Sequence, residues 1–98
     1  MVSNTEKYKE IIVPIVLKYL PNVSIILYGS RARGDNQEGS DIDIALNATM
    51  KIKEEIMIAI KNDLEDSKLP ICFDIVDFHA ISGRLRDEIE KHGIVWIK

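Results

Sequence analysis

Residues 25–46 read IILYGSRARGDNQEGSDIDIAL, two apolar runs joined by a polar crossing. The first run ends at Gly29 and Ser30, and the second contains Asp41 and Asp43, one residue apart. Glycine lets a backbone turn sharply and approach a ligand closely. Ser30 can then open a short helical turn whose unpaired amides attract anions. The pattern therefore predicts a phosphate-binding turn close to two carboxylates.

The two carboxylates lie in an alternating sequence, in which Ile42 and Ile44 follow Asp41 and Asp43 in turn. On a strand, such alternation places both carboxylates on one face and both isoleucines on the face toward the core. Like charges held this close repel, and a hard divalent cation with oxygen ligands relieves the repulsion. We expect that cation to be Mg²⁺.

These motifs resemble a known family. Gly29-Ser30, ten intervening residues and then Asp41-x-Asp43 are similar to the signature of the DNA polymerase β-type nucleotidyltransferases. The fuller strings, GSRARG at 29–34 and SDID at 40–43, resemble the smallest members, the MNT (minimal nucleotidyltransferase) proteins. Those are typically antitoxins encoded beside a HEPN-domain toxin. The resemblance covers nearly the whole chain.

The resemblance implies an activity and a set of site residues. Asp41 and Asp43, with a third carboxylate in a later strand, here Asp74, would be catalytic and would hold two Mg²⁺ ions. Gly29 and Ser30 would bind the phosphates of an NTP, which the resemblance implies is ATP, and the AMP of that nucleotide would pass to an acceptor hydroxyl. The acceptor would be a side chain, commonly tyrosine, of a HEPN toxin bound in a hetero-oligomer.

The strand expected over residues 71–78 offers two acidic residues, Asp74 and Asp77. Side chains alternate across a sheet, so only one of the two can face the site. Asp74 lies in mid-strand, where an unpaired carboxylate would be costly without a metal. Asp77 lies near the strand's end and can bond the following turn. We therefore predict that Asp74 is the third ligand.

Two arginines follow the phosphate turn, Arg31 and Arg33. Their position favours a contact between at least one guanidinium and the triphosphate. Both could instead be solvated or paired with Asp35 and Glu38. The sequence leaves these two interpretations open.

Composition limits the class of protein. Ninety-eight residues, 46% hydrophobic and 30% charged, fit one nucleotidyltransferase domain over residues 1–98. A net charge of −3 argues against nucleic acid as a direct partner. The single cysteine, Cys72, is expected to be buried in a strand, which excludes a disulfide framework and suits a reducing cytoplasm. We see no signal peptide or apolar run of about 18 residues, so we expect a cytoplasmic protein that does not enter a membrane. His79 and His92 lack metal-ligand spacing, so we expect surface or capping roles.

Periodicity predicts alternating strands and helices. The first helix should start at Asn4 or Thr5 and run to about residue 20, with Pro14 causing a kink or dividing it into two shorter helices. Further along the chain we expect four strands, at residues 23–28, starting at Asp41, at 71–78 and at 94–97. A loop should span residues 34–40, and a turn and helix cap should lie at 47–49. Two more helices should follow, one at 50–66 and one at 83–91 with Ser82 as its cap. This order predicts an α/β or α+β domain with a mixed sheet and helices packed against it.

Two other functions fit parts of the pattern. A non-catalytic nucleotide-binding module would keep the turn but neutralise a toxin by occlusion. A small-molecule transferase would ordinarily need an added acceptor-binding domain, which we do not find. The intact mass of the partner after incubation with ATP and magnesium distinguishes the enzyme from the module.

Overall fold

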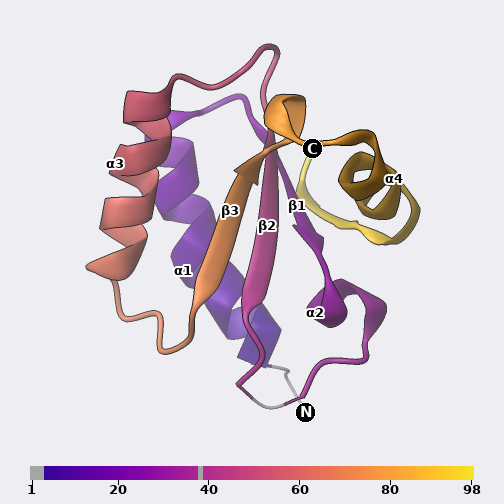
Figure 1. Cartoon of the computed structure of the whole chain (residues 1–98). Coiled ribbons are helices and arrows are strands. Elements are labelled where there is room, and N and C mark those ends of the chain that lie inside the picture. The colour runs from indigo at the N-terminus through magenta and orange to yellow at the C-terminus, as the bar shows by residue number, and fades with distance from the viewer. Residues whose placement is uncertain (1–3, 38) are drawn as a thin grey trace.

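Four strands form one mixed sheet, with helices on both of its faces (Figure 1). The computed structural model describes residues 4–37 and 39–98. In chain order the elements are α1 (Asn4–Tyr19), β1 (Ser24–Tyr28), α2 (Ser30–Arg33), β2 (Ile42–Asn47), α3 (Glu54–Glu65), β3 (Phe73–Asp77), the 3₁₀ turn η1 (Phe78–Ala80), α4 (Gly83–His92) and β4 (Ile94–Ile97).

The strands lie in the order β3-β2-β1-β4. Strand β1 pairs antiparallel with both β2 and β4, whereas β2 pairs parallel with β3. A parallel pair requires a crossover connection, and α3 supplies it. The predicted class, a small α/β or α+β domain with a mixed sheet and helices packed against it, is confirmed.

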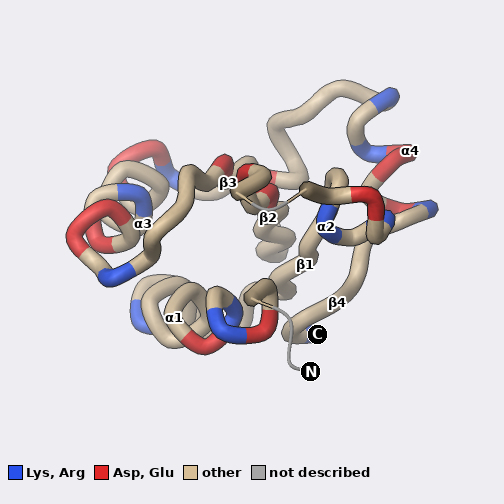
Figure 2. The backbone as a smooth tube through the Cα atoms, turned by 90° about the horizontal axis from the view of Figure 1, so that it is seen from below, with Lys and Arg blue, Asp and Glu red and all other residues tan. Residues whose placement is uncertain are grey.

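The two faces of the sheet carry different cores because successive side chains of a strand point to opposite faces. Helices α1 and α3 lie on one side of the strands and α2 and α4 on the other (Figure 2). The larger core, between the sheet and α1 and α3, includes Ile12, Val16, Ile25, Leu27, Ile42, Ile44, Leu46, Ile60, Leu64 and Ile75. The smaller core, under α4, contains Tyr28, Ala45, Phe78 and Ile89.

Several boundaries match the prediction closely, including those of β1 and β4. Ser82 is the N-cap residue of α4, although its side chain makes no capping hydrogen bond. Helix α1 runs unbroken from Asn4 to Tyr19 with Pro14 inside it, so the alternative of two shorter helices is wrong. Pro14 is exposed, and water can satisfy the carbonyl that loses its amide partner.

The start of α3 differs from the expectation. The helix begins at Glu54 rather than at residue 50, with Lys53 as its N-cap residue, so the cap predicted within 47–49 is wrong. The amide of Ile52 donates to Asp77 Oδ2 at 2.7 Å, and Ile52 itself is buried. Because this hydrogen bond ties Ile52 to the end of β3, residues 50–53 stay out of the helix.

Cys72 was predicted to be buried, and it is exposed. Strand β3 begins at Phe73, two residues later than expected, so Cys72 precedes the strand. Strand β3 is also an edge strand of the sheet, with only β2 beside it among the described residues. Within the same residues, no helix is both long and apolar enough to cross a membrane.

Candidate active site

The turn after β1 has the backbone geometry that the sequence predicts. Gly29 has φ 76° and ψ −156°, and α2 begins at the next residue, Ser30. The Gly29 carbonyl accepts the amides of Ala32 and Arg33, both at 3.1 Å. The amides of Ser30 and Arg31 have no backbone acceptor within residues 4–37 and 39–98. The first amides of the turn are therefore available to an anion.

One carboxylate lies directly against this turn. A Cβ atom at Gly29 would collide with Asp43 Oδ2 and lie 3.2 Å from Asp43 Cγ. Position 29 therefore favours glycine for two reasons, its positive φ and the close approach of the Asp43 side chain. This approach places the turn at Gly29 and Ser30 directly beside the acidic strand β2.

A row of polar side chains crosses the sheet at this level. Strand register places Tyr28 opposite Asp43, and Asp43 opposite Asp74. Because side chains alternate between the two faces along a strand, all three lie on the face of the sheet opposite α1 and α3. The Tyr28 hydroxyl donates to Asp74 Oδ2 at 3.4 Å. Asp41, just before β2, and Asp74 are exposed, whereas Asp43 is half-buried.

The row carries unbalanced negative charge. Burial raises the pKa of the Asp43 carboxyl above its usual range, and the charges of Asp74 and Asp41 raise it further. The guanidinium of Arg33 acts in the opposite direction on that pKa. Burial, followed by the charges of Asp74 and Asp43, also raises the pKa of the Tyr28 hydroxyl above its ordinary value. A bound cation would relieve this repulsion.

The donor set fits a hard cation such as Mg²⁺. All the candidate ligands, Asp41, Asp43 and Asp74, are carboxylates. Among residues 4–37 and 39–98, no three His, Cys, Asp or Glu side chains form a ready-made metal site. Proteins commonly bind Mg²⁺ through one or two carboxylates together with substrate phosphates. The phosphate turn beside Asp43 suits that mode, in which the nucleotide completes the coordination.

Asp77 has a structural role. The residue is 7% exposed, and its carboxylate accepts hydrogen bonds from the amides of Ile52 at 2.7 Å and His79 at 2.9 Å. It therefore bonds the turn after β3, as its position predicts, while Asp74 lies opposite Asp43. His79 also lies at the surface, with Nε2 2.6 Å from the Ala48 carbonyl.

The two arginines have different partners. Arg31 donates to the Ser40 carbonyl and to the Thr5 hydroxyl. Arg33 pairs with Asp35, at 3.2 Å from Nε to Oδ2, and with Glu88 of α4. The predicted pairing with Asp35 is thus present. The other predicted partner, Glu38, lies outside the described residues.

Sequence reasoning missed Tyr28 and Glu88. Tyr28 was visible in principle, because it directly precedes Gly29 at the end of a strand. Glu88 gave no signal, since it lies 55 residues from Arg33 along the chain. Only the packing of α4 beside α2 brings the two together.

Known proteins share this fold. The family described as "Polymerase beta, Nucleotidyltransferase" matches residues 10–98, and a comparison with curated proteins finds no match. A toxin–antitoxin crystal structure with AMP-PNP has a TM-score of 0.77 at 25% identity, over 92% of this chain and 73% of that chain. A structure of tri-AMPylated Shewanella oneidensis HEPN toxin in complex with MNT antitoxin scores 0.73 at 22% identity, over 95% and 72%.

A further structure, described as a minimal nucleotidyltransferase, has a TM-score of 0.71 at 22% identity, and the match covers 93% of this chain and 91% of that chain. The family match includes the phosphate turn, all three candidate carboxylates and every strand. The chain therefore belongs to the polymerase β-type nucleotidyltransferase family.

Proposed function

We propose that this protein is a Mg²⁺-dependent nucleotidyltransferase that transfers AMP from ATP to a hydroxyl of a HEPN toxin and thereby acts as its antitoxin. The observation that supports the proposal is the close approach of the Asp43 carboxylate to Gly29, because a turn with free amides beside a row of carboxylates suits a nucleotide and its metal ion. Family membership supports the reaction type.

Each residue of the site has a role in this proposal. The amides of Ser30 and Arg31 and the Ser30 hydroxyl bind the β- and γ-phosphates, and Arg33 adds positive charge beside them. Asp41, Asp43 and Asp74 would hold Mg²⁺, which would supply charge neutralisation and lower the pKa of the acceptor hydroxyl.

Asp74 completes the site from the neighbouring strand. Its carboxylate accepts the proton of the acceptor hydroxyl while the acceptor oxygen attacks the α-phosphorus and pyrophosphate leaves. The Tyr28 hydroxyl, which donates to Asp74 Oδ2, orients this carboxylate. Holding the reactants in line and neutralising their charge would supply most of the rate acceleration.

The partner assignment is supported by what similar structures contain. One is a toxin–antitoxin with AMP-PNP, and another is an AMPylated HEPN toxin in complex with an MNT antitoxin. A toxin that acts inside the cell would place the pair in the cytoplasm, and the single cysteine suits a reducing compartment. The family match covers residues 10–98, and we propose that the nucleotidyltransferase domain spans residues 1–98.

The test is the intact mass of the HEPN protein encoded by the neighbouring gene, after incubation with this protein, ATP and Mg²⁺. We expect a gain of whole adenylyl groups with the wild type. Asp43→Asn, and wild type in EDTA, should give none. An unchanged mass with a stable complex would instead support the non-catalytic module.

A further inference from the structure

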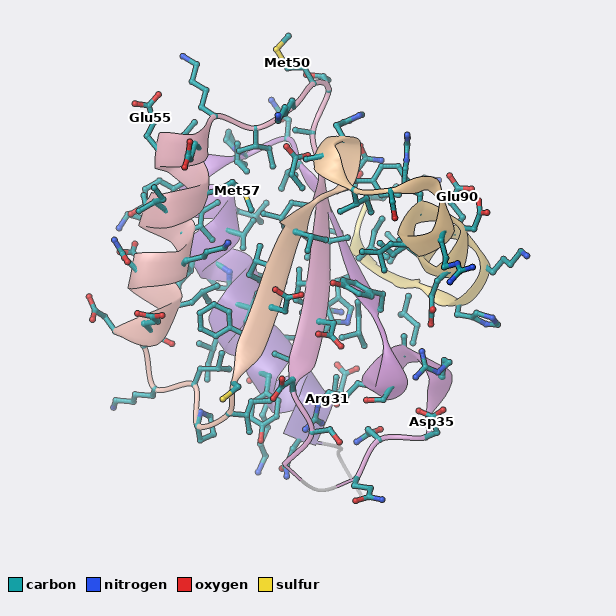
Figure 3. The ribbon with its side chains drawn as sticks, viewed as in Figure 1. Arg31, Asp35, Met50, Glu55, Met57 and Glu90 are labelled. Carbon is teal, nitrogen blue, oxygen red and sulfur yellow. The ribbon has the colours of Figure 1, made fainter. Side chains whose placement is uncertain are left out.

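Arg31 makes contacts that do not point toward the phosphate site. Its Nε and Nη2 atoms both donate to the Ser40 carbonyl, at 3.1 and 2.8 Å, and Nη1 donates to Thr5 Oγ1 at 2.9 Å. Figure 3 shows Arg31 at the lower end of β2, beside the start of α1. The guanidinium thus bridges two segments that are far apart in the sequence.

The guanidinium is also held from a third side. Its Cζ atom lies 5.3 Å from the centre of the Tyr8 ring, and Tyr8 is buried in the larger core. An arginine fork with two bonds to one carbonyl and a ring against it has little rotational freedom. Arg31 is therefore a fixed bridge rather than a solvated side chain.

The bridge connects the two halves of the site. Arg31 directly follows Ser30 of the phosphate turn, and Ser40 directly precedes Asp41. Asp41 lies just outside β2, whose first residue, Ile42, donates its amide to the Cys72 carbonyl at 3.1 Å. The backbone of Asp41 is thus fixed by the sheet on one side and, through Ser40, by Arg31 on the other.

We propose that Arg31 is a positioning residue that sets the place of Asp41, and that Thr5 at the start of α1 holds Arg31 for this purpose. The inference rests on the proposed function in so far as Asp41 is a metal ligand there. It differs from a direct contact of Arg31 with the triphosphate, which remains the opposing outcome.

Thr5 allows a test that leaves the phosphate site untouched. Thr5→Val removes the hydroxyl that accepts from Arg31 but keeps the shape of the side chain, and Thr5→Ser restores the hydroxyl. Arg31→Lys keeps the charge and loses the fork. These variants separate the bridge from simple electrostatic attraction.

The first readout is amide hydrogen exchange of Ser40 and Ile42, without metal or nucleotide. Both amides are bonded in the structure, to the carbonyls of Gln37 and Cys72. We expect exchange about tenfold faster in Thr5→Val and Arg31→Lys, as for the loss of one charge-assisted hydrogen bond. Thr5→Ser should stay within about twofold of wild type. Unchanged exchange in Thr5→Val would overturn the bridge.

The second readout is the rise in melting temperature on adding Mg²⁺ alone. A displaced Asp41 should bind the ion more weakly, so half of the full rise should need several-fold more Mg²⁺ in Thr5→Val and Arg31→Lys, and Thr5→Ser should behave as wild type. An unchanged Mg²⁺ requirement in both variants would contradict the positioning of Asp41. This measurement needs no transfer activity, so it stands even if the proposed reaction fails.

The third readout separates positioning from contact. In transfer assays, positioning predicts a lower kcat in both variants, partly restored by excess Mg²⁺, with KM for ATP unchanged. Direct contact predicts a raised KM in Arg31→Lys alone and no effect of Thr5→Val, and that result would refute the proposal. Absence of transfer by the wild type would count against the proposed function, while exchange and Mg²⁺ binding still judge the bridge.

Discussion

Replacing Gly29 by alanine should have two effects: it should strain the backbone of the turn, and it should displace the Asp43 carboxylate. Gly29 has φ 76° and ψ −156°, a conformation that is essentially open to glycine alone. Holding alanine there costs about 1–3 kcal/mol. The new Cβ also meets Asp43 Oδ2, and rotating that side chain off its preferred rotamer adds about 1 kcal/mol.

We therefore expect Gly29→Ala to lose about 2–4 kcal/mol of unfolding free energy. For a chain of this length, each kcal/mol lowers the melting temperature by about 4–8 °C. Urea titration and thermal melting by circular dichroism measure both quantities. Transfer activity should fall further than stability explains, because the displaced carboxylate is a proposed metal ligand.

The chain offers a matched control in Gly34. It also has a positive φ, 85°, but among residues 4–37 and 39–98, its chain neighbours aside, no atom lies within 4 Å of a Cβ built there. Gly34→Ala should therefore cost only the strain of a left-handed residue, about 1–2 kcal/mol, and leave Asp43 in place.

A double-mutant cycle isolates the contact. In an Asp43→Ala background, Gly29→Ala should be less destabilising by about 1 kcal/mol, whereas Gly34→Ala should be unaffected. If the cost of Gly29→Ala were the same with and without the Asp43 side chain, the contact between turn and carboxylate would be refuted.

Three further predictions follow from the charged groups. The pKa of Asp43 is raised above its ordinary 3.8, so the folded chain holds this proton more tightly than the unfolded chain. Its contribution to stability is present below pH 3.8 and is lost as pH rises through the raised value. In EDTA at pH 7, Asp43→Asn should therefore melt at or above the wild-type temperature, and its stability should not show this loss as pH rises. A melting temperature below that of the wild type would contradict the proposed repulsion among the carboxylates. Asp77→Asn leaves one of the two bonded amides without an acceptor, so urea titration should show a loss of about 1–3 kcal/mol of unfolding free energy, with KM for ATP unchanged. An altered KM would contradict the purely structural role of Asp77. Glu88→Gln frees Arg33 for phosphate and should lower KM for ATP severalfold in steady-state kinetics, whereas Asp87→Asn, one residue away, should not; equal effects would point to general charge alone.

The sequence predicts the backbone geometry around the candidate site residues well where the signal is local. Gly29 and Ser30 are adjacent, and Asp41 and Asp43 follow within one loop, so turn chemistry and strand alternation locate them without tertiary information. The same alternation correctly sets Asp74 on the other face from Asp77. The metal and nucleotide roles of these residues stay predictions.

The errors arise where distant contacts override local preference. Residues 50–53 continue the apolar period of α3, but the bond from Ile52 to Asp77, 25 residues away, keeps them out of the helix. Cys72 looked buried because it adjoins apolar residues, yet it lies before an edge strand. Whether a strand lies at an edge depends on the order of the whole sheet, which no local window contains.

The fate of each phosphate of ATP tests the central claim most directly. The purified protein and its HEPN partner are incubated with Mg²⁺ and ATP labelled at either the α- or the γ-phosphorus, with Asp43→Asn as the control. We predict that the α-label becomes bound to the partner protein and that the γ-label leaves as pyrophosphate, both only with the wild type. Transfer of the γ-label to the partner, or α-label incorporation that survives Asp43→Asn, would contradict nucleotidyl transfer at this site.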